Sequence, residues 1–258
     1  MGESSTVFKY FDLDTGLRGL ENQTIAFSRP DRFNDPFDCS VELLKIDAAA
    51  TREHMAGAFI RILDNNYSER FRLKRQMNKA TDQQVEALAK KGLKFEDSHR
   101  GVTCFSTSFD EILMWAHYCR NHHGICIGYD IVKMYRFLRS HINEIGYFPV
   151  DYVDHLDKKS LYPVSNEAIL YMLRTKSDIW KYEKEVRITG TKFRFNEELI
   201  NIVKLAPGII THVYIGINAN QKQTDRVLKL ANDLNPKIAV FKMRANYTSF
   251  TLVPETLG

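Results

Sequence analysis

The chain has 258 residues, of which 44% are apolar and 26% are charged, and its formal net charge is +4. This composition is typical of a globular protein with a sizeable core, and it excludes a wholly disordered chain. The charge excess is too small for a dedicated nucleic-acid-binding protein, although it permits an anionic ligand.

Three further properties concern the cellular environment. The first twenty residues carry acidic residues and lack a continuous apolar segment, so we expect no signal peptide. No apolar run approaches the ~20 residues that a membrane span needs. The four cysteines lack CxxC or zinc-knuckle spacing, which favours reduced thiols. We therefore expect a soluble cytoplasmic protein without membrane contact.

The N-terminal half alternates short strands and helices around one long helical stretch. Residues 47–95 are highly charged and contain no proline, which predicts two or three helices forming an insertion or lobe. Around this lobe we expect strands at 7–11, 24–28, 101–108 and 124–130, and helices at 13–20 and 110–121.

The C-terminal half continues the mixed pattern. We expect strands at 145–153, 185–189, 209–217, 238–244 and 249–254, and helices after 130, at 166–173 and at 221–234. A GxGxxG turn after a strand is absent, which disfavours a doubly wound parallel sheet. The pattern indicates an α+β fold in which residues 1–258 form a single domain with a mixed or antiparallel split sheet.

The segment Trp180-Lys181-Tyr182-Glu183-Lys184-Glu185 stands at the beginning of the predicted strand 185–189. Side chains alternate across a strand, so Glu183, Glu185 and Arg187 are expected on one face. Two neighbouring carboxylates repel each other, which raises one pKa and couples their titrations. Either Arg187 neutralises the pair or the protein uses the pair in a functional site.

Two other segments carry polar groups that could line a site. Ser106 and Ser108 lie at the end of strand 101–108 and are expected on one face, although serine is also common where a strand runs into a turn. In the helix 110–121, Tyr118 could offer a stacking surface at the edge of a cleft, or it could simply hydrogen-bond within the fold.

The loop 29–38, with the sequence RPDRFNDPFD, places Asn34, Asp35 and Asp38 beside Arg29 and Arg32. A loop held by proline is ordered in advance, which suits ligand binding. Asparagine and aspartate before proline can equally form turns with their own backbone. The histidines His117, His122 and His123 lack the spacing of a HExxH motif, so we expect no metal site.

Five segments together resemble a known family: FKYF, FSRPDRFNDPFDC, CFSTS, MWAHYCRNHHGICIGYD and KSDIWKYEKEVRI. In this order they are similar to the bacterial family catalogued as domain of unknown function 2971, over roughly residues 7–217. Residues 47–95 carry none of these motifs and look like the variable part.

A second, more distant resemblance concerns chemistry. A strand with an aromatic or basic residue, then STS, then ExE looks like the order of motifs in mono-ADP-ribosyltransferases. This resemblance implies NAD as the cofactor, Glu185 as the catalytic glutamate and Glu183 as its partner. It also implies that Ser106 and Ser108 support the nicotinamide pocket.

The same resemblance assigns roles to the first strand. Lys9 or Tyr10 would stand in for the first-motif residue, although the arginine or histidine usual in that family is absent from FKYF. We expect Lys9, Asn34 and Tyr118 to contact NAD, and Tyr10 to act beside the two glutamates.

Two hypotheses of function follow. The first is an NAD-dependent transferase that modifies a nucleic acid or protein, as a toxin or anti-phage effector with a possible antitoxin or immunity partner, and with the helical stretch 47–95 contacting the target. The second is a non-catalytic ligand-sensing or protein-binding module, in which Glu183 and Arg187 form a structural salt bridge.

Overall fold

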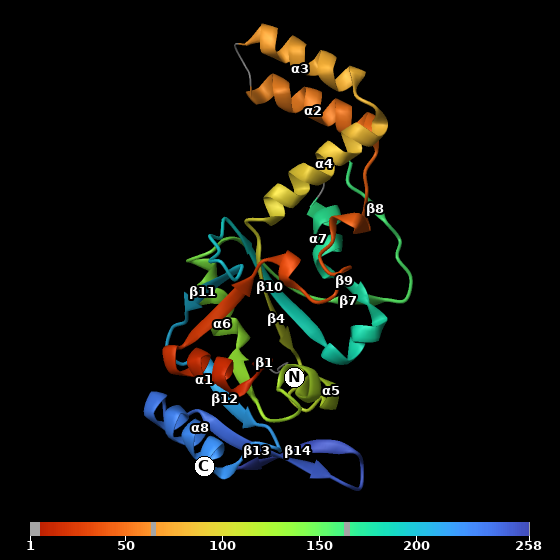
Figure 1. Ribbon diagram of the computed structural model, residues 1–258. Coiled ribbons are helices and arrows are strands. Elements are labelled where there is room, and N and C mark those ends of the chain that lie inside the picture. Colours follow the sequence, from red (N-terminus) through yellow and green to blue (C-terminus); the bar gives the residue numbers. More distant parts are fainter. Residues whose placement is uncertain (1–5, 63–65, 163–165, 258) are drawn as a thin grey trace.

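A ten-stranded sheet forms the body of the protein (Figure 1). The computed structural model describes residues 6–62, 66–162 and 166–257. The sheet consists of β1 (Thr6–Phe11), β2 (Thr24–Ser28), β4 (Gly101–Ser106), β5 (Ile125–Asp130), β6 (Asn143–Pro149), β10 (Glu185–Thr191), β11 (Ile200–Lys204), β12 (Ile210–Ile215), β13 (Ala239–Asn246) and β14 (Thr251–Thr256). Its main path runs β11-β2-β4-β1-β5-β12-β13-β14, and β10 joins β4 to β6 beside this path.

The sheet is mixed. The pair β12 and β13 is parallel, whereas the other pairs within it are antiparallel. Two small parallel pairs lie outside it, β3 (Leu44–Lys45) with β8 (Lys159–Ser160) and β7 (Asp151–Val153) with β9 (Thr175–Ser177). Helices are interspersed among the strands, but the sheet that they cover is mixed and mostly antiparallel, so the α+β prediction is confirmed.

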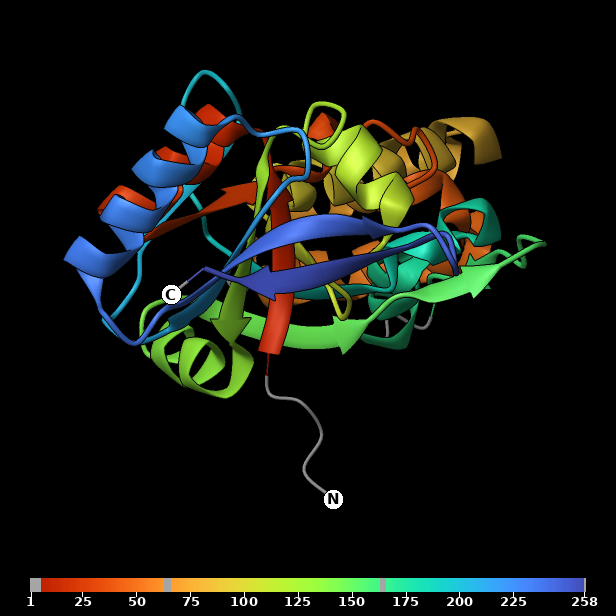
Figure 2. The same cartoon turned by 90° about the horizontal axis from the view of Figure 1, so that it is seen from below.

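Helices cover both faces of the sheet. The larger core lies beneath α1 (Leu13–Asn22), α6 (Ile131–Arg139) and α8 (Gln221–Leu234), while α5 (Ile112–Tyr118) covers a smaller core. Along β5, Ile125 and Ile127 belong to the larger core and Cys126 to the smaller one, so the two cores lie on opposite faces. Seen from below, α1 and α8 lie side by side (Figure 2).

A third core links the sheet to the loop that follows β2. It contains Cys39 and Val41 from that loop, Phe148 from β6, and Met172 and Leu173 from α7 (Asn166–Arg174). The described residues also form short 3-10 helices at η1 (Pro30–Arg32), η2 (Val41–Leu43) and η3 (Asp178–Glu183). This core holds the loop and α7 against β10, where the candidate site lies.

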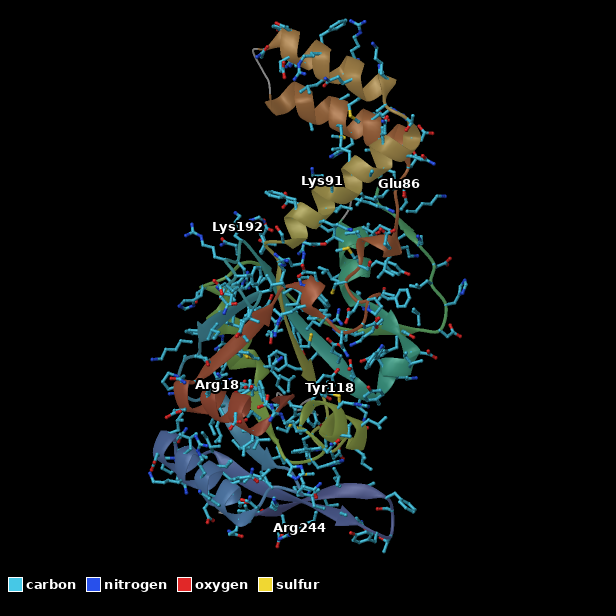
Figure 3. The ribbon with its side chains drawn as sticks, in the orientation of Figure 1. Arg18, Glu86, Lys91, Tyr118, Lys192 and Arg244 are labelled. Atoms are coloured by element: carbon cyan, nitrogen blue, oxygen red, sulfur yellow. The ribbon has the colours of Figure 1, made fainter. Side chains whose placement is uncertain are left out.

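Three helices extend from one end of the sheet, and we call them the helical arm (Figure 1). They are α2 (Ala48–Ile62), α3 (Tyr67–Lys79) and α4 (Asp82–Asp97), and they occupy the range 47–95 that was predicted to be helical. Helix α4 begins with a capping box between Thr81 and Gln84, which satisfies two backbone N–H groups. Figure 3 shows Glu86 and Lys91 on the arm and Tyr118 in the sheet body. That the whole chain is one domain stays a prediction.

Several element boundaries match the sequence analysis closely. Strand β2 and helix α8 have the predicted bounds, because turn and capping residues flank both. The strand predicted at 101–108 ends at Ser106, however, so its extension to Ser108 is wrong. Among the described residues, none of the helices has the length and apolar character needed to cross a membrane.

Gly124, directly before β5, tests the close approach of this segment to the end of β1. A Cβ atom at this position would lie 2.0 Å from the Phe11 carbonyl oxygen, a backbone atom that cannot move aside. We expect Gly124→Ala to lower the free energy of unfolding by at least about 3 kcal/mol, measured by urea denaturation.

Gly92→Ala on α4 is the matched control. A Cβ atom there has no neighbour within 4 Å, so alanine should stabilise the helix by about 0.5–1 kcal/mol. Equal stability of the Gly124→Ala variant and the wild type would contradict the close approach.

Candidate functional site

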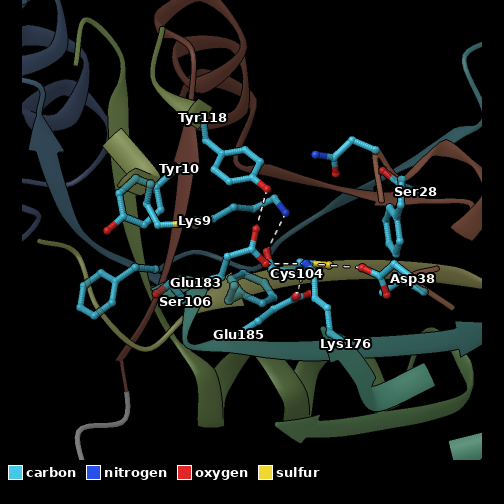
Figure 4. A pocket seen from close by; sticks show the side chains of 16 residues that line it. Lys9, Tyr10, Ser28, Asp38, Cys104, Ser106, Tyr118, Lys176, Glu183 and Glu185 are labelled. Carbon is cyan, nitrogen blue, oxygen red and sulfur yellow. Dashed lines mark hydrogen bonds and ion pairs between the residues drawn. The ribbon is translucent and has the colours of Figure 1, made fainter. Parts of the chain in front are cut away.

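A cavity lies where the main sheet splits. One edge of β4 pairs with β10 along its whole length, while the other edge meets β2 at Val102 and β1 at Ser106. Between these two points, the carbonyl oxygen of Cys104 accepts a hydrogen bond from Lys9 Nζ at 2.8 Å. The cavity beside this gap has a volume of about 190 Å³ and is walled by strands, the loop after β2 and α5 (Figure 4).

Most of the residues singled out from the sequence line this one cavity. They come from five separate segments of the chain: Lys9, Tyr10, Asn34, Ser106, Tyr118, Glu183 and Glu185. The strands β1, β4 and β10, which carry FKYF, the first serine of STS and the second glutamate of ExE, are neighbours in the sheet. The fold therefore brings the three motifs together, although their roles stay predictions.

Ser108 lies outside this group of lining residues. The strand has ended at Ser106, whose hydroxyl accepts a hydrogen bond from the Ser108 backbone N–H at 3.1 Å. The Ser108 hydroxyl donates to Asp110, and its carbonyl accepts from the Tyr10 hydroxyl at 2.9 Å. The two serines therefore form a turn and do not share a strand face.

Glu183 is not on the strand either, which corrects the expectation that Glu183, Glu185 and Arg187 alternate along one strand. Glu183 ends the 3-10 helix η3, and Lys184 follows it in a left-handed conformation with φ of 46°. Strand β10 begins only at Glu185. The turn at Lys184 nevertheless directs both carboxylates into the same cavity, and it leaves the Lys184 side chain exposed.

A cluster of buried charges forms the floor beneath the two glutamates. Lys176 on β9 lies 2.5 Å from Glu183, 3.0 Å from Glu185 and 3.4 Å from Asp38 (Figure 4). Arg187 donates to both oxygens of Glu185 at 2.7 and 3.1 Å, and to Asp38 at 2.8 Å. All five side chains are buried, and Arg187 is completely inaccessible to solvent.

The guanidinium of Arg187 also fixes the surrounding backbone and loop. It donates to the Leu173 carbonyl at 2.7 Å and to Cys39 Sγ at 3.1 Å, and it lies over the Phe33 ring at 5.7 Å. One cation thus ties β10 to α7 and to the loop after β2. Removing any one of these partners would leave part of the buried charge uncompensated, which is strongly destabilising.

Glu185 is the more strongly ionised of the two glutamates. Burial would raise its pKa, but Arg187 and Lys176 reverse this effect and lower the pKa to about 2. Its backbone N–H donates to the Tyr152 hydroxyl at 2.8 Å. Glu185 is therefore a fixed negative charge at neutral pH.

Glu183 titrates in the opposite direction. Burial raises its pKa, and the neighbouring Glu185 charge adds to this shift beyond what Lys176 offsets. The Tyr118 hydroxyl donates to Glu183 Oε1 at 2.7 Å. Lys176 has a raised pKa, because three carboxylates outweigh the burial that would lower it. Two carboxylates with pKa values shifted apart are a common arrangement in acid–base catalysis.

Tyr10 is buried and Lys9 is half-buried in the wall of the cavity, and burial shifts the pKa of both side chains. Burial lowers the pKa of Lys9 against the raising effect of Glu185, and its Nζ lies 5.4 Å from the centre of the Phe105 ring. Burial raises the pKa of Tyr10 well above its usual range, and its ring packs edge-on against Trp115. Tyr10 therefore forms a wall of the cavity with its hydroxyl already bound.

Sequence reasoning missed Lys176 as a member of the site, and it named Asp38 only as a polar residue of the loop 29–38. Lys176 is the first residue of the quoted segment KSDIWKYEKEVRI, so its place in that motif was the available signal. Its pairing with three carboxylates depends on contacts between β9, η3 and the distant loop that no local pattern reveals. Within the described ranges, the side chains form no group of three or more His, Cys, Asp or Glu placed to hold a metal ion.

Removal of the Arg187 guanidinium tests the cluster as a structural unit. Arg187→Met keeps much of the side-chain volume but leaves Glu185 and Asp38 buried with one cation fewer. We expect the free energy of unfolding to fall by about 3–5 kcal/mol in urea denaturation at pH 7. The exposed pair of Arg244 and Glu255 offers a control, because Arg244→Met should change it by less than about 1 kcal/mol.

The pKa of Glu185 predicts a dependence of stability on pH. Because the pKa in the folded state, about 2, lies below the ordinary value of 4.5, Glu185 stabilises the fold fully above pH 4.5. This stabilisation is lost as the pH falls through 2. The difference in unfolding free energy between wild type and Glu185→Gln should therefore narrow by about 3 kcal/mol from pH 6 to pH 2.

For Glu183→Gln, the difference in unfolding free energy from wild type should change with pH in the opposite direction. The raised pKa of Glu183 means that its ionisation costs stability as the pH rises above 4.5, so this variant should gain stability relative to wild type at higher pH. If the difference in unfolding free energy between wild type and Glu185→Gln were equal at pH 6 and pH 2, Glu185 would not have the lowered pKa assigned to it.

A comparison with known protein families matches the segment that carries part of this site. Residues 114–188 match the model of a family described as "Protein of unknown function (DUF2971)". The match runs from α5 to β10 and so includes Tyr118, Lys176, Glu183 and Glu185. Searches of curated proteins and of solved structures gave no match. The resemblance to domain of unknown function 2971 is thus supported over this part of the chain.

Proposed function

We propose that the cavity binds the nicotinamide–ribose end of NAD and that the protein transfers ADP-ribose to a nucleic acid or protein. The observation that carries this proposal is the convergence of β1, β4 and β10 on one cavity that contains Glu185. In the transferases that the motif order resembles, the same three motifs surround the reacting ribose.

The size and walls of the cavity suit one end of such a ligand. Its volume of about 190 Å³ lies below the roughly 300–1,000 Å³ of a pocket that encloses a drug-sized molecule. The walls include the aromatic rings of Phe8, Phe33 and Phe105, against which a flat ring can stack. The cavity would hold the nicotinamide and ribose, while the rest of the dinucleotide lies beyond its mouth.

Glu185 would act as an electrostatic stabiliser. Breaking the bond between ribose C1′ and the nicotinamide nitrogen develops positive charge on the sugar, as in glycoside hydrolysis. A carboxylate that is ionised and held in place by Arg187 and Lys176 needs no reorganisation to face that charge. Its low pKa prevents it from serving as a proton donor.

Glu183 would handle the proton of the acceptor. The electron pair of the broken bond leaves with neutral nicotinamide, and a lone pair of the acceptor forms the new bond to C1′. The acceptor then releases one proton. Glu183 has a raised pKa, so it is the better proton acceptor of the two carboxylates. The Tyr118 hydroxyl would orient it through the bond to Oε1.

Several neighbouring residues would bind and position the ligand. Lys9 and Ser106 line the cavity along the split of the sheet, Asn34 lines it from the loop after β2, and Tyr10 contributes a wall. The helical arm, which projects from the sheet body, would contact the macromolecular acceptor (Figure 1). Such an activity would suit a toxin or an anti-phage effector, with an antitoxin or immunity protein as a partner.

A second candidate function is favoured by a specific observation. Both oxygens of Glu185 and both oxygens of Glu183 already accept hydrogen bonds within the protein. A cluster satisfied in this way also fits a non-catalytic module that senses a small ligand or binds a protein. In that case the ligand would bind without being consumed.

Release of nicotinamide from NAD tests the proposal. The wild-type protein, incubated with labelled NAD and a cell lysate, should release nicotinamide and label a macromolecule. Glu185→Gln should lower kcat by about 10²–10³-fold, because the stabilising charge is lost. Glu21→Gln, an exposed substitution on α1, should retain full activity.

Further measurements separate the two candidates. Tyr118→Phe removes only a hydroxyl and should lower kcat while leaving the fold intact, even if Glu185→Gln proves unstable. Expression of the wild type should slow host growth, and Glu185→Gln should relieve this effect. Binding of NAD without release of nicotinamide or labelling would exclude the transferase and favour the sensing module.

A further inference from the structure

A second cavity lies on the other side of the loop that follows β2. Its volume is about 460 Å³, and it is bounded by residues 29–41 and by the C-terminal end of α4. Phe33 and Asp38 line both cavities, so the loop forms a wall between them. The site proposed for NAD makes no use of this second space.

Two carboxylate oxygens at the second cavity lack partners. Asp35 is 6% exposed, and its Oδ1 accepts a hydrogen bond from the Phe37 backbone N–H at 2.9 Å. Its Oδ2 is buried and has no hydrogen-bond partner among the residues that the structure describes. The same holds for Oδ1 of Asp38, which is 8% exposed. Buried acceptors of this kind are costly unless a ligand supplies the donor.

The charges around the cavity indicate what kind of donor fits. Of the basic groups that line it, Arg29 is engaged by Asp31, and Lys94 has an exposed side chain at the rim. Asp97 is paired with Arg100 at 2.9 Å. Among the described residues, the buried Asp35 is the lining carboxyl group that has no cation at ion-pair distance. An anionic group such as a phosphate would be repelled there, while a cation with N–H donors would be attracted.

The walls suit an organic cation. Phe33 presents an aromatic ring, and Pro30 and Pro36 provide apolar surface on either side of the acidic groups. A planar guanidinium or a compact ammonium can stack on such a ring while donating to carboxylate oxygens.

We propose that the second cavity binds an organic cation with N–H donors, of the amine or amidine class. Asp35 Oδ2 and Asp38 Oδ1 accept its hydrogen bonds, and Phe33 contacts its apolar side. This site goes beyond the reaction proposed for the first cavity and does not depend on it. Asp38 connects the two, because its other oxygen lies 2.8 Å from Arg187 and 3.4 Å from Lys176.

Binding of butylguanidine to the full chain tests this site, measured by isothermal calorimetry without NAD. The wild type should bind the probe saturably, and butylurea, which has nearly the same shape but no charge, should bind at least about tenfold more weakly. Butylamine and a blocked arginine serve as further probes, to distinguish a free amine from a protein side chain.

Asp35→Asn isolates the contribution of the unpartnered oxygen. Asparagine keeps the acceptor that holds the Phe37 N–H, but it places an amide donor where Oδ2 was. We expect the affinity for butylguanidine to fall by at least about tenfold. Asp31→Asn makes the same change of charge at the rim and should lower the affinity by less than about threefold.

Three results would overturn the proposal: no saturable binding of butylguanidine, butylamine or the blocked arginine by the wild type, equal binding of butylguanidine and butylurea, or equal effects of the two aspartate variants. If Asp35→Asn does not fold, the comparison of the charged and neutral probes on the wild type decides alone. Because NAD is absent throughout, failure here leaves the result of the nicotinamide assay unaffected.

Discussion

The buried ion cluster around Arg187 holds the site together. Arg187 reaches β10, α7 and the loop after β2 through Glu185, Leu173 and Asp38, and it is completely inaccessible to solvent. Replacing a whole buried ion cluster by hydrophobic residues often changes the free energy of unfolding little. Removing one member of the cluster lowers it strongly, because a buried charge is left unpaired. The cluster is therefore better understood as a device that fixes positions than as a source of stability. It fixes both glutamates and the wall shared by the two cavities.

The split of the sheet supplies the space that the cluster faces. If β1 and β2 both paired along β4, the edge of β4 would be filled and no cavity would form there. Instead the carbonyl of Cys104 at the gap bonds to the side chain of Lys9. A buried backbone group needs a partner, so the lysine compensates for the missing strand pairing. The same residue brings a cation close to Glu185.

Local patterns predicted the elements well and the site only in part. Alternating apolar residues and capping residues define β2 and α8, so both were predicted with the correct bounds. The prediction that Glu183 lies on the strand was wrong, because Lys184 forms a left-handed turn before β10 begins at Glu185. No glycine or proline in the sequence signals this turn. Lys176 was missed because its role arises from contacts made only in the folded chain.

The charges of the cluster answer the question of whether Arg187 cancels the two glutamates. Asp38, Glu183 and Glu185 carry three negative charges, while Lys176 and Arg187 carry two positive ones. Arg187 has its contacts with Glu185 and Asp38, and it makes none with Glu183. Glu183 is therefore the carboxyl group whose ionised form the two cations compensate least, in keeping with its raised pKa. Arg187 neutralises and orients Glu185. Glu183 makes no contact with Arg187 and faces the cavity with a raised pKa.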